Sequence, residues 1–169
     1  MEIKTVHKVR AIVLREGKIA VTKQSKAFIL PGGKIEQGET NEETLSREIR
    51  DELGIEISHN EIMGPFCRRG VQYESQDEDG NAIYKRMITS FYIINTTQDF
   101  DYEKINLTPR EKARGVKPYW VNPAKLEYFL TVQKDSYKCK YACRYAKEYL
   151  TIYQKFKQYQ IKSKEEIEK

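Results

Sequence analysis

The segment from Gly33 to Ile55 constrains this chain more than any other stretch, because it joins a glycine-rich turn to an acidic helical pattern. Thr40 followed by Glu43 forms a capping box, in which the hydroxyl accepts the amide at the third helical position and the glutamate reaches back to the cap. Gly54 lies where a helix would end in a left-handed residue. These signals predict a helix from Asn41 to Leu53.

The carboxylates of this helix are expected to gather on one side. At about 100° per residue, Glu48 and Glu52 stack beside the apolar stripe of the helix, whereas Asp51 lies further round, near Arg47. Two stacked glutamates at a buried edge are unfavourable unless a positive charge lies between them. Mg²⁺ or Mn²⁺ suits such oxygen ligands and commonly also binds substrate phosphates. The alternative is a solvated helix face with charges paired at i,i+4, but the fixed spacing of the whole segment argues against it.

The spacing resembles the Nudix box: glycine, five residues, glutamate, seven residues, Arg-Glu, an apolar residue, any residue, two glutamates, any residue, glycine and an apolar residue. The positions that carry the resemblance are Gly33, Glu39, Arg47, Glu48 and Glu52. The resemblance implies an α/β fold, namely a Nudix-type α/β/α sandwich with a mixed sheet, and the C-terminal helical pattern adds a long helix to it. It also implies a metal-dependent hydrolase that cleaves the pyrophosphate linkage of a nucleoside diphosphate joined to another moiety.

For the metal site, Glu48 and Glu52 are expected to be the principal ligands of Mg²⁺ or Mn²⁺. Asp51 replaces the first of the paired glutamates of the box, so its reach is one methylene shorter, and it is expected to support the metal directly or through water. The resemblance adds the carbonyl of Gly32 to the metal shell. Gly33 is a substrate-binding candidate, because a glycine lets the backbone approach a ligand closely.

The catalytic candidates are Glu48 together with Glu39 and Arg47. The family pattern implies that Glu39 positions water or a second cation. Arg47 is expected to orient Glu39 or Asp51 by bidentate pairing without touching the substrate.

The family often supplies one more glutamate, as an extra ligand or general base, from a loop shortly before an aromatic strand. Glu111 fits that place and is the fourth catalytic candidate, with Glu103 as its competitor. The alternative reading of Glu111 is a first-turn glutamate after Pro109 that the helix dipole stabilises.

The substrate itself is not readable from the sequence. Tyr73 lies near the place where dinucleoside polyphosphate hydrolases often carry a tyrosine, which makes it a substrate-binding candidate. One rival function is a catalytically inactive Nudix-fold module that binds a nucleotide or RNA, but the intact Glu48 and Glu52 pair argues against it. A second rival, an enzyme acting on RNA ends, lacks a basic-aromatic RNA-binding signature.

The composition indicates a cytoplasmic protein without a membrane partner, and the resemblance implies a small-molecule nucleotide substrate rather than a nucleic acid. No apolar run is long enough for a membrane span, and no signal-peptide core is present. Cys67, Cys139 and Cys143 are an odd number without a disulfide framework, so reduced thiols are expected. The net charge of +5 is concentrated between residues 131 and 160, where a solvated basic helix face is the expected reading.

The chain reads as one domain over residues 1–160, followed by a charged, disordered tail at 161–169. The expected strands are Val6–Leu14, Ile19–Thr22, Phe28–Leu30, Ile62–Tyr73, Ile83–Asn95 and Tyr119–Val121. Pro31–Gly33 is expected to be a loop, 74–81 a hairpin tip, and Asn95–Arg114 a mobile loop over the site. Helices are predicted from Pro123 to Leu130 and from Lys134 to Gln160.

The last helix carries a tyrosine at every fourth position and so has a broad aromatic band. Core packing is expected for Tyr141, Tyr145 and Tyr149, because a band this wide would otherwise be a large exposed apolar patch. Tyr137 and Tyr153 are candidates for contact with a partner, such as a second copy in a homodimer or a nucleotide base.

Overall fold

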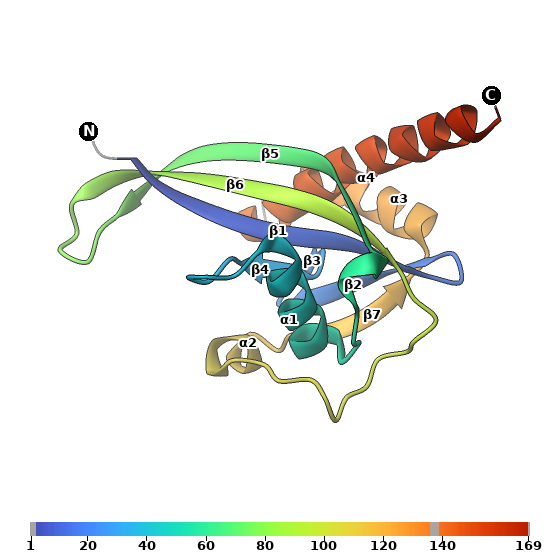
Figure 1. Cartoon of the computed structure of the whole chain (residues 1–169). Helices are drawn as coiled ribbons and strands as arrows, with labels where there is room; N and C mark the ends of the chain where they lie inside the picture. Colours follow the sequence, from blue (N-terminus) through green and yellow to red (C-terminus); the bar gives the residue numbers. More distant parts are fainter. Residues whose placement is uncertain (1–2, 136–138, 169) are drawn as a thin grey trace.

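A computed structural model describes residues 3–135 and 139–168 of the chain. The strands form one mixed sheet in the order β3-β2-β1-β6-β5, to which β4 adds by pairing with β1 and β7 by pairing with β2 (Figure 1). The strands are β1 (Ile3–Arg15), β2 (Lys18–Gln24), β3 (Ala27–Ile29), β4 (Gly32–Lys34), β5 (Ile62–Gln76), β6 (Ala82–Asn95) and β7 (Lys117–Val121). The helices are α1 (Asn41–Leu53), the 3-10 turn η1 (His59–Glu61), α2 (Pro109–Ala113), α3 (Pro123–Gln133) and α4 (Lys140–Ile167).

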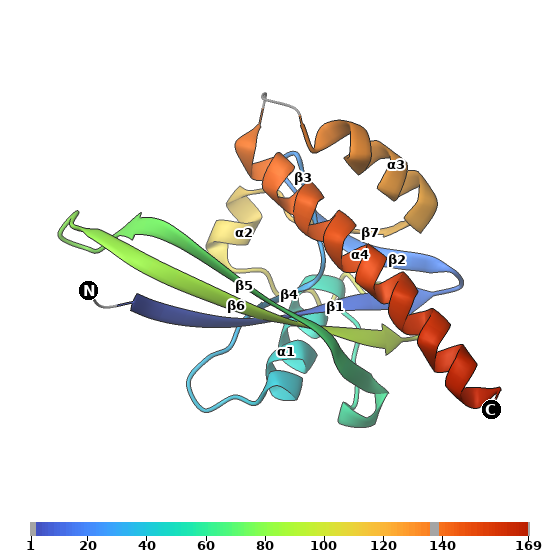
Figure 2. The ribbon, with the colours of Figure 1, turned by 90° about the horizontal axis from the view of Figure 1, so that it is seen from above.

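Strand β1 is the centre of the sheet, because it pairs in parallel with β6 and antiparallel with β2 and β4. Its side chains alternate between two cores. Val9 and Ala11 pack with α1 on one face, and Ile12 packs with α3 and α4 on the other. Both faces of β1 are therefore covered, as its nearly continuous apolar sequence predicts. The α/β/α sandwich expected from the resemblance is confirmed (Figure 2).

Helix α1 has the bounds that the sequence predicts. The Thr40 hydroxyl accepts the Glu43 amide at 3.2 Å, and the Glu43 carboxylate accepts the Thr40 amide at 2.8 Å. Gly54 ends the helix with φ 70°, a left-handed conformation that favours glycine. The apolar stripe of the helix is fully buried against the sheet, and its members are Leu45, Ile49 and Leu53.

Helix α4 lies across the face of the sheet opposite α1 (Figure 2). Tyr145 and Tyr149 are buried there, which confirms core packing for both, and Tyr141 is half-buried beside them. Tyr153 was a candidate for partner contact, but it packs half-buried against the core cluster of α3 and α4. Tyr137 lies outside the described residues.

Two expectations at the ends of α4 differ from the structure. The helix begins at Lys140, whereas the sequence pattern placed its start at Lys134. It continues to Ile167, through most of the 161–169 segment for which a disordered tail was expected. Lysine, glutamate and glutamine are good helix formers, so the exposed last turns can extend a helix that its first turns anchor to the sheet.

Two predicted loops also contain regular structure. Gly32 to Lys34 forms β4 on β1, and the segment 95–114 contains the short helix α2. The carbonyl of Arg114, at the end of α2, accepts the amide of Ser25 at 3.2 Å, which ties α2 to the β2–β3 turn.

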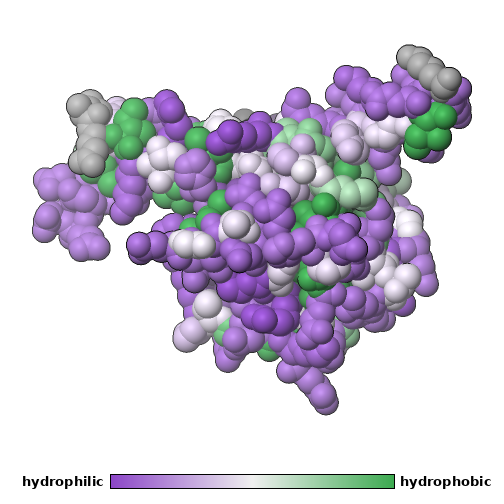
Figure 3. Space-filling view, in the orientation of Figure 1, coloured by the Kyte–Doolittle hydropathy of each residue, from purple (hydrophilic) through white to green (hydrophobic). Residues whose placement is uncertain are grey.

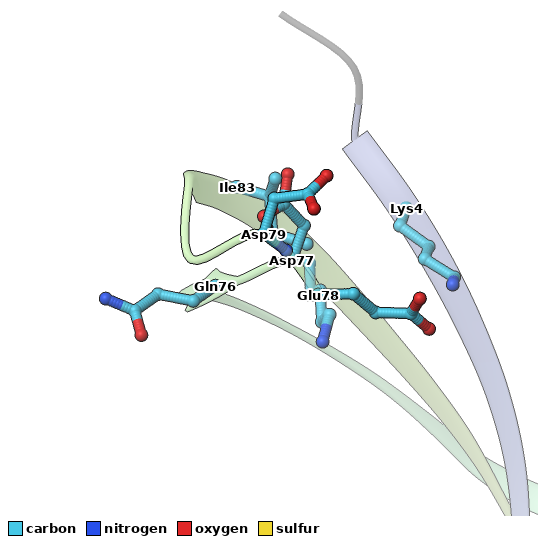
Figure 4. Close-up of a pocket in the computed structure, with 7 residues that line it drawn as sticks. Lys4, Gln76, Asp77, Glu78, Asp79 and Ile83 are labelled. Carbon is cyan, nitrogen blue, oxygen red and sulfur yellow. Dashed lines mark hydrogen bonds between the residues drawn. The ribbon is translucent and has the colours of Figure 1, made fainter.

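The β5–β6 hairpin extends well beyond the sandwich (Figure 1). Its tip is the turn predicted at 74–81, where the Asp77 carboxylate accepts the amides of Asp79 and Asn81. The side chains around the tip form an open surface pocket with Lys4 of β1 (Figure 4). Within the described residues, no helix is long and apolar enough to cross a membrane.

Candidate metal centre

Three glutamates from two helices meet beside the edge of β4. Glu48 and Glu52 come from α1 and Glu111 comes from α2, and each offers one carboxylate oxygen within 4.8 Å of the others. We call these three residues the carboxylate cluster. Glu103, the competitor of Glu111, is exposed and does not join it.

Glu111 also has a local structural role. Its Oε2 accepts the amide of Thr108 at 2.7 Å and the Thr108 hydroxyl at 2.8 Å, which caps α2 after Pro109. Glu111 is thus a first-turn glutamate after Pro109, as the alternative reading expected, and it also lies in the carboxylate cluster.

Glu52 is the most buried member of the cluster, with 4% of its surface exposed. Burial, reinforced by the neighbouring charge of Glu48, raises the pKa of Glu52 to about 8. The amide of Gly32 donates to its Oε2 at 3.0 Å and partly opposes that shift. Gly32 therefore contacts the cluster through its backbone amide. The role of its carbonyl as a metal ligand, which the resemblance implies, stays a prediction.

Glu48 lies against the backbone of β4. A Cβ on Gly33 would overlap the Glu48 carboxylate, so a side chain at this position would displace that carboxylate. The sequence led to the expectation that Gly33 would approach the substrate, whereas the group it approaches in the structure is a cluster side chain. Burial raises the pKa of Glu48, and Arg47 acts against that shift.

Arg47 binds two carboxylates at once. Its Nε donates to Oε1 of Glu39 at 2.7 Å and its Nη2 to Oε2 at 3.0 Å, while its Nη1 donates to Oε1 of Glu48 at 2.8 Å. The hydrogen bonds from Arg47 lower the pKa of Glu39 to about 2. Of the two partners expected for Arg47, Glu39 is the one that the structure pairs with it. The hydroxyl of Thr44, which sequence analysis did not single out, also donates to Glu39, at 2.8 Å.

Two candidates lie outside the carboxylate cluster. Asp51 pairs with Arg50 at 3.2 Å, although its charge still acts on Glu48. Tyr73 is exposed on the projecting part of β5. Arg68 of β5 is aligned with Gly33 across the strands of the sheet. Tyr73 lies five residues further along β5, so Tyr73 is about 17 Å from Arg68.

The donor set of the cluster fits a hard divalent cation. Carboxylate oxygens are the ligands that Mg²⁺ and Mn²⁺ prefer, and three of them converge here from two helices. Burial raises the pKa of both Glu48 and Glu52, and the charges of neighbouring carboxylates add to each shift, so the ionised cluster is incompletely compensated by its surroundings. A bound cation would supply that compensation.

A sequence profile of the NUDIX domain matches residues 5–141, which is most of the chain. The chain belongs to the NUDIX domain family. The NUDIX segment is 38% identical over 72 residues to the CTP pyrophosphohydrolase of Escherichia coli (strain K12), a match that covers 39% of this chain and 53% of the relative. The chain thus spans about half the length of the curated relative that it matches.

Two solved structures are similar to this chain. An Ap4A hydrolase from Caenorhabditis elegans superposes with a TM-score of 0.53 at 15% identity, covering 94% of this chain and 98% of that one. A MutT protein from Bacillus halodurans gives a TM-score of 0.48 at 17% identity, covering 73% and 72%. The first of these extends the structural likeness over α4 as well as the sandwich.

Sequence analysis missed Arg10, which lies inside the otherwise apolar strand β1. The residue is 6% exposed, and its guanidinium donates to the carbonyl of Leu30 at 2.5 Å and acts on Glu52 by its charge. The available signal was an arginine between Val9 and Ala11, because an unpaired cation is rarely placed in a buried strand.

Proposed function

We propose that this protein is a metal-dependent NUDIX pyrophosphohydrolase that cleaves the pyrophosphate linkage of a nucleotide. The observation that carries the proposal is the convergence of Glu48, Glu52 and Glu111 within 4.8 Å, with the pKa of the most buried one raised to about 8. A buried group of like charges is unfavourable by itself, and such perturbed carboxylates are characteristic of functional sites.

The residues of the cluster would hold Mg²⁺ or Mn²⁺, with the Gly32 carbonyl as a further ligand implied by the family pattern and Asp51 in support through water. When bound, the cation supplies charge neutralisation at the phosphates and makes coordinated water more acidic. Glu52 has to give up a proton to become a ligand, because its raised pKa keeps the carboxyl largely protonated near neutrality.

The remaining residues position the cluster. Arg47 holds Glu48 with one arm of its guanidinium and Glu39 with the other, which fixes both carboxylates relative to α1. Glu39 stays ionised, since its pKa is about 2, and is suited to orient a water molecule. Within the cluster, Glu111 is the member that comes from α2, and the family pattern assigns such a loop glutamate the role of extra ligand or of general base that takes a proton from the attacking water.

The substrate class is proposed from the relatives. One relative is named as acting on CTP and a structural neighbour on Ap4A, and both compounds contain consecutive phosphates. We infer that this chain takes a small nucleotide that contains a pyrophosphate linkage.

The experiment is a screen of nucleoside triphosphates, dinucleoside polyphosphates and nucleotide sugars, with Mg²⁺ or Mn²⁺ and with chelator, followed by chromatographic identification of the products. Metal-dependent release of a mononucleotide together with phosphate, pyrophosphate or the other moiety is expected. Glu103→Gln is a matched control, because it neutralises an exposed carboxylate that does not join the cluster. Binding of a nucleotide without turnover of any of them would instead favour the inactive nucleotide-binding module.

A further inference from the structure

Basic side chains gather around Tyr145 on the face of the sheet opposite helix α1. Arg10 of β1 lies with its Cζ 5.7 Å from the centre of the Tyr145 ring, and Arg144 of α4 lies 5.0 Å from the same point. Nη2 of Arg144 also donates to the Tyr145 hydroxyl at 3.2 Å. Lys8, two residues before Arg10, acts on Tyr145 by its charge. We call Lys8, Arg10, Arg144 and Tyr145 the basic cluster.

Positive charge dominates the surroundings of this cluster. Tyr141 meets Tyr145 edge-on, with ring centres 4.9 Å apart, and the charge of Arg114 at the end of α2 acts on Tyr141. Glu148 supplies a carboxylate, whose Oε2 lies 4.0 Å from Nε of Arg10. Counting Lys8, Arg10, Arg114 and Arg144 against Glu148 gives four cations and one anion.

The ionisation of two members reflects this excess. Burial, followed by the repulsion of Arg10, lowers the pKa of the Lys8 ammonium. Burial by itself would raise the pKa of the Tyr145 phenol, but the charges of Arg10, Arg144 and Lys8 outweigh it, and the pKa is lowered. The lowered pKa of the Tyr145 phenol therefore reflects a positive potential at this side chain, which an anion would relieve.

The basic cluster adjoins the carboxylate cluster through two connections. Arg10 pairs with Gly32 across the β1–β4 ladder, and Gly32 donates to Glu52. Helix α2 provides the second connection, because it carries Glu111 to the carboxylate cluster and ends at Arg114 near Tyr141. The two clusters are thus separated by the β1–β4 ladder, and Arg144 is the exposed member on the side of the basic cluster.

We propose that the basic cluster binds phosphate groups of the substrate that lie beyond the linkage cleaved at the carboxylate cluster. The preferred substrates are then nucleosides with three or more consecutive phosphates, and nucleotide sugars are poor ones. This proposal rests on the proposed function for the position of the cleaved linkage. A neutral sugar in the same place would leave the cations with Glu148 as their one counter-charge among the groups counted above, whereas phosphate oxygens make strong charge-assisted hydrogen bonds with arginine.

The first test measures binding of inorganic tripolyphosphate to the full chain by calorimetry, in chelator and without divalent metal. Arg144→Gln and Lys8→Gln should each weaken binding about tenfold, since each removes a charge-assisted contact. Glu148→Gln should tighten binding severalfold, because it removes the opposing charge. The matched control is Lys162→Gln, which neutralises an exposed lysine about 27 Å further along α4 and should change binding less than twofold.

The second test compares the Michaelis constants of ATP and ADP-ribose in the presence of Mg²⁺. Arg144→Gln should raise the constant for ATP about tenfold and leave that for ADP-ribose and both turnover numbers unchanged. Thermal unfolding of each variant establishes that the fold is retained, and Arg144 is suitable because it is exposed.

Two results would overturn the proposal: tripolyphosphate binding that is equal in wild type, Arg144→Gln and Lys8→Gln, or an equal loss for ATP and ADP-ribose. Absence of turnover for every nucleotide would contradict the proposed function instead. In that case the calorimetry, which needs no hydrolysis, still decides whether the basic cluster binds phosphate.

Discussion

Replacing Glu52 with glutamine is expected to stabilise the metal-free protein and, at the same time, to remove most of its metal-dependent activity. The amide is nearly isosteric with the carboxylate, and its oxygen can still accept the Gly32 amide that lies 3.0 Å from Oε2. What the substitution removes is a buried ionisable group beside the charge of Glu48. A structural carboxylate that is satisfied in the fold would behave in the opposite way.

The size of the stability effect follows from the pKa of Glu52, which is raised from an ordinary value of 4.5 to about 8. Between these values the native state binds more protons than the unfolded state, so the stability of the wild type falls as pH rises from about 4.5 to about 8. At pH 7 the raised pKa of Glu52 lowers the free energy of unfolding by about 3 kcal/mol, because each pH unit above the ordinary value of 4.5 contributes roughly 1.4 kcal/mol. We expect Glu52→Gln to recover about 1–3 kcal/mol, or about 3–9 °C in melting temperature for a chain of this size.

The assay is thermal unfolding of wild type and Glu52→Gln from pH 5 to pH 9 in chelator, repeated with Mg²⁺. The melting temperature of the variant should decline less than that of the wild type in this range, because the raised pKa of Glu48 remains in both, and added Mg²⁺ should stabilise the wild type only. Turnover of the best substrate should fall on the order of 10²-fold or more in the variant. Glu103→Gln should match the wild type in all three measurements, because that carboxylate is exposed and lies outside the cluster.

The reasoning is refuted if metal-free Glu52→Gln is less stable than the wild type at pH 8, since the carboxylate would then be a favourable part of the fold. Equal stabilisation of both proteins by Mg²⁺ would remove Glu52 from the ligand set.

Three further predictions concern single contacts. Gly33→Ala should lower kcat/KM at least tenfold in a steady-state assay, because its Cβ would displace the Glu48 carboxylate; unchanged kinetics would show that Glu48 has another productive position. Asp51→Asn should be much milder than Glu48→Gln in rates measured across Mg²⁺ concentration, since Asp51 lies outside the carboxylate cluster; equal losses would make Asp51 a direct ligand. Tyr149→Phe should raise the free energy of unfolding by about 1 kcal/mol in chemical denaturation, because its buried hydroxyl has no hydrogen-bond partner among the described residues, and destabilisation would reveal one.

The sequence by itself determined the features that depend on neighbouring residues. The capping box at Thr40 and Glu43 and the left-handed Gly54 are local, so α1 has its predicted bounds. The placement of Glu48 and Glu52 on one side of that helix follows from helical periodicity alone. The aromatic band of α4 was predictable for the same reason, as the burial of Tyr145 and Tyr149 shows.

Only the tertiary structure decided which distant groups share a site. Glu111 joins Glu48 because the end of α2 is tied to the β2–β3 turn, and a spacing of more than sixty residues contains no information about that contact. Tyr73 has a suitable place in the sequence, but the register of β5 on β6 places it on the projecting hairpin. Arg10 meets Tyr145 because β1 turns its even-numbered residues toward α4. In each case strand register and helix packing set the distance, and both depend on contacts formed across the whole fold.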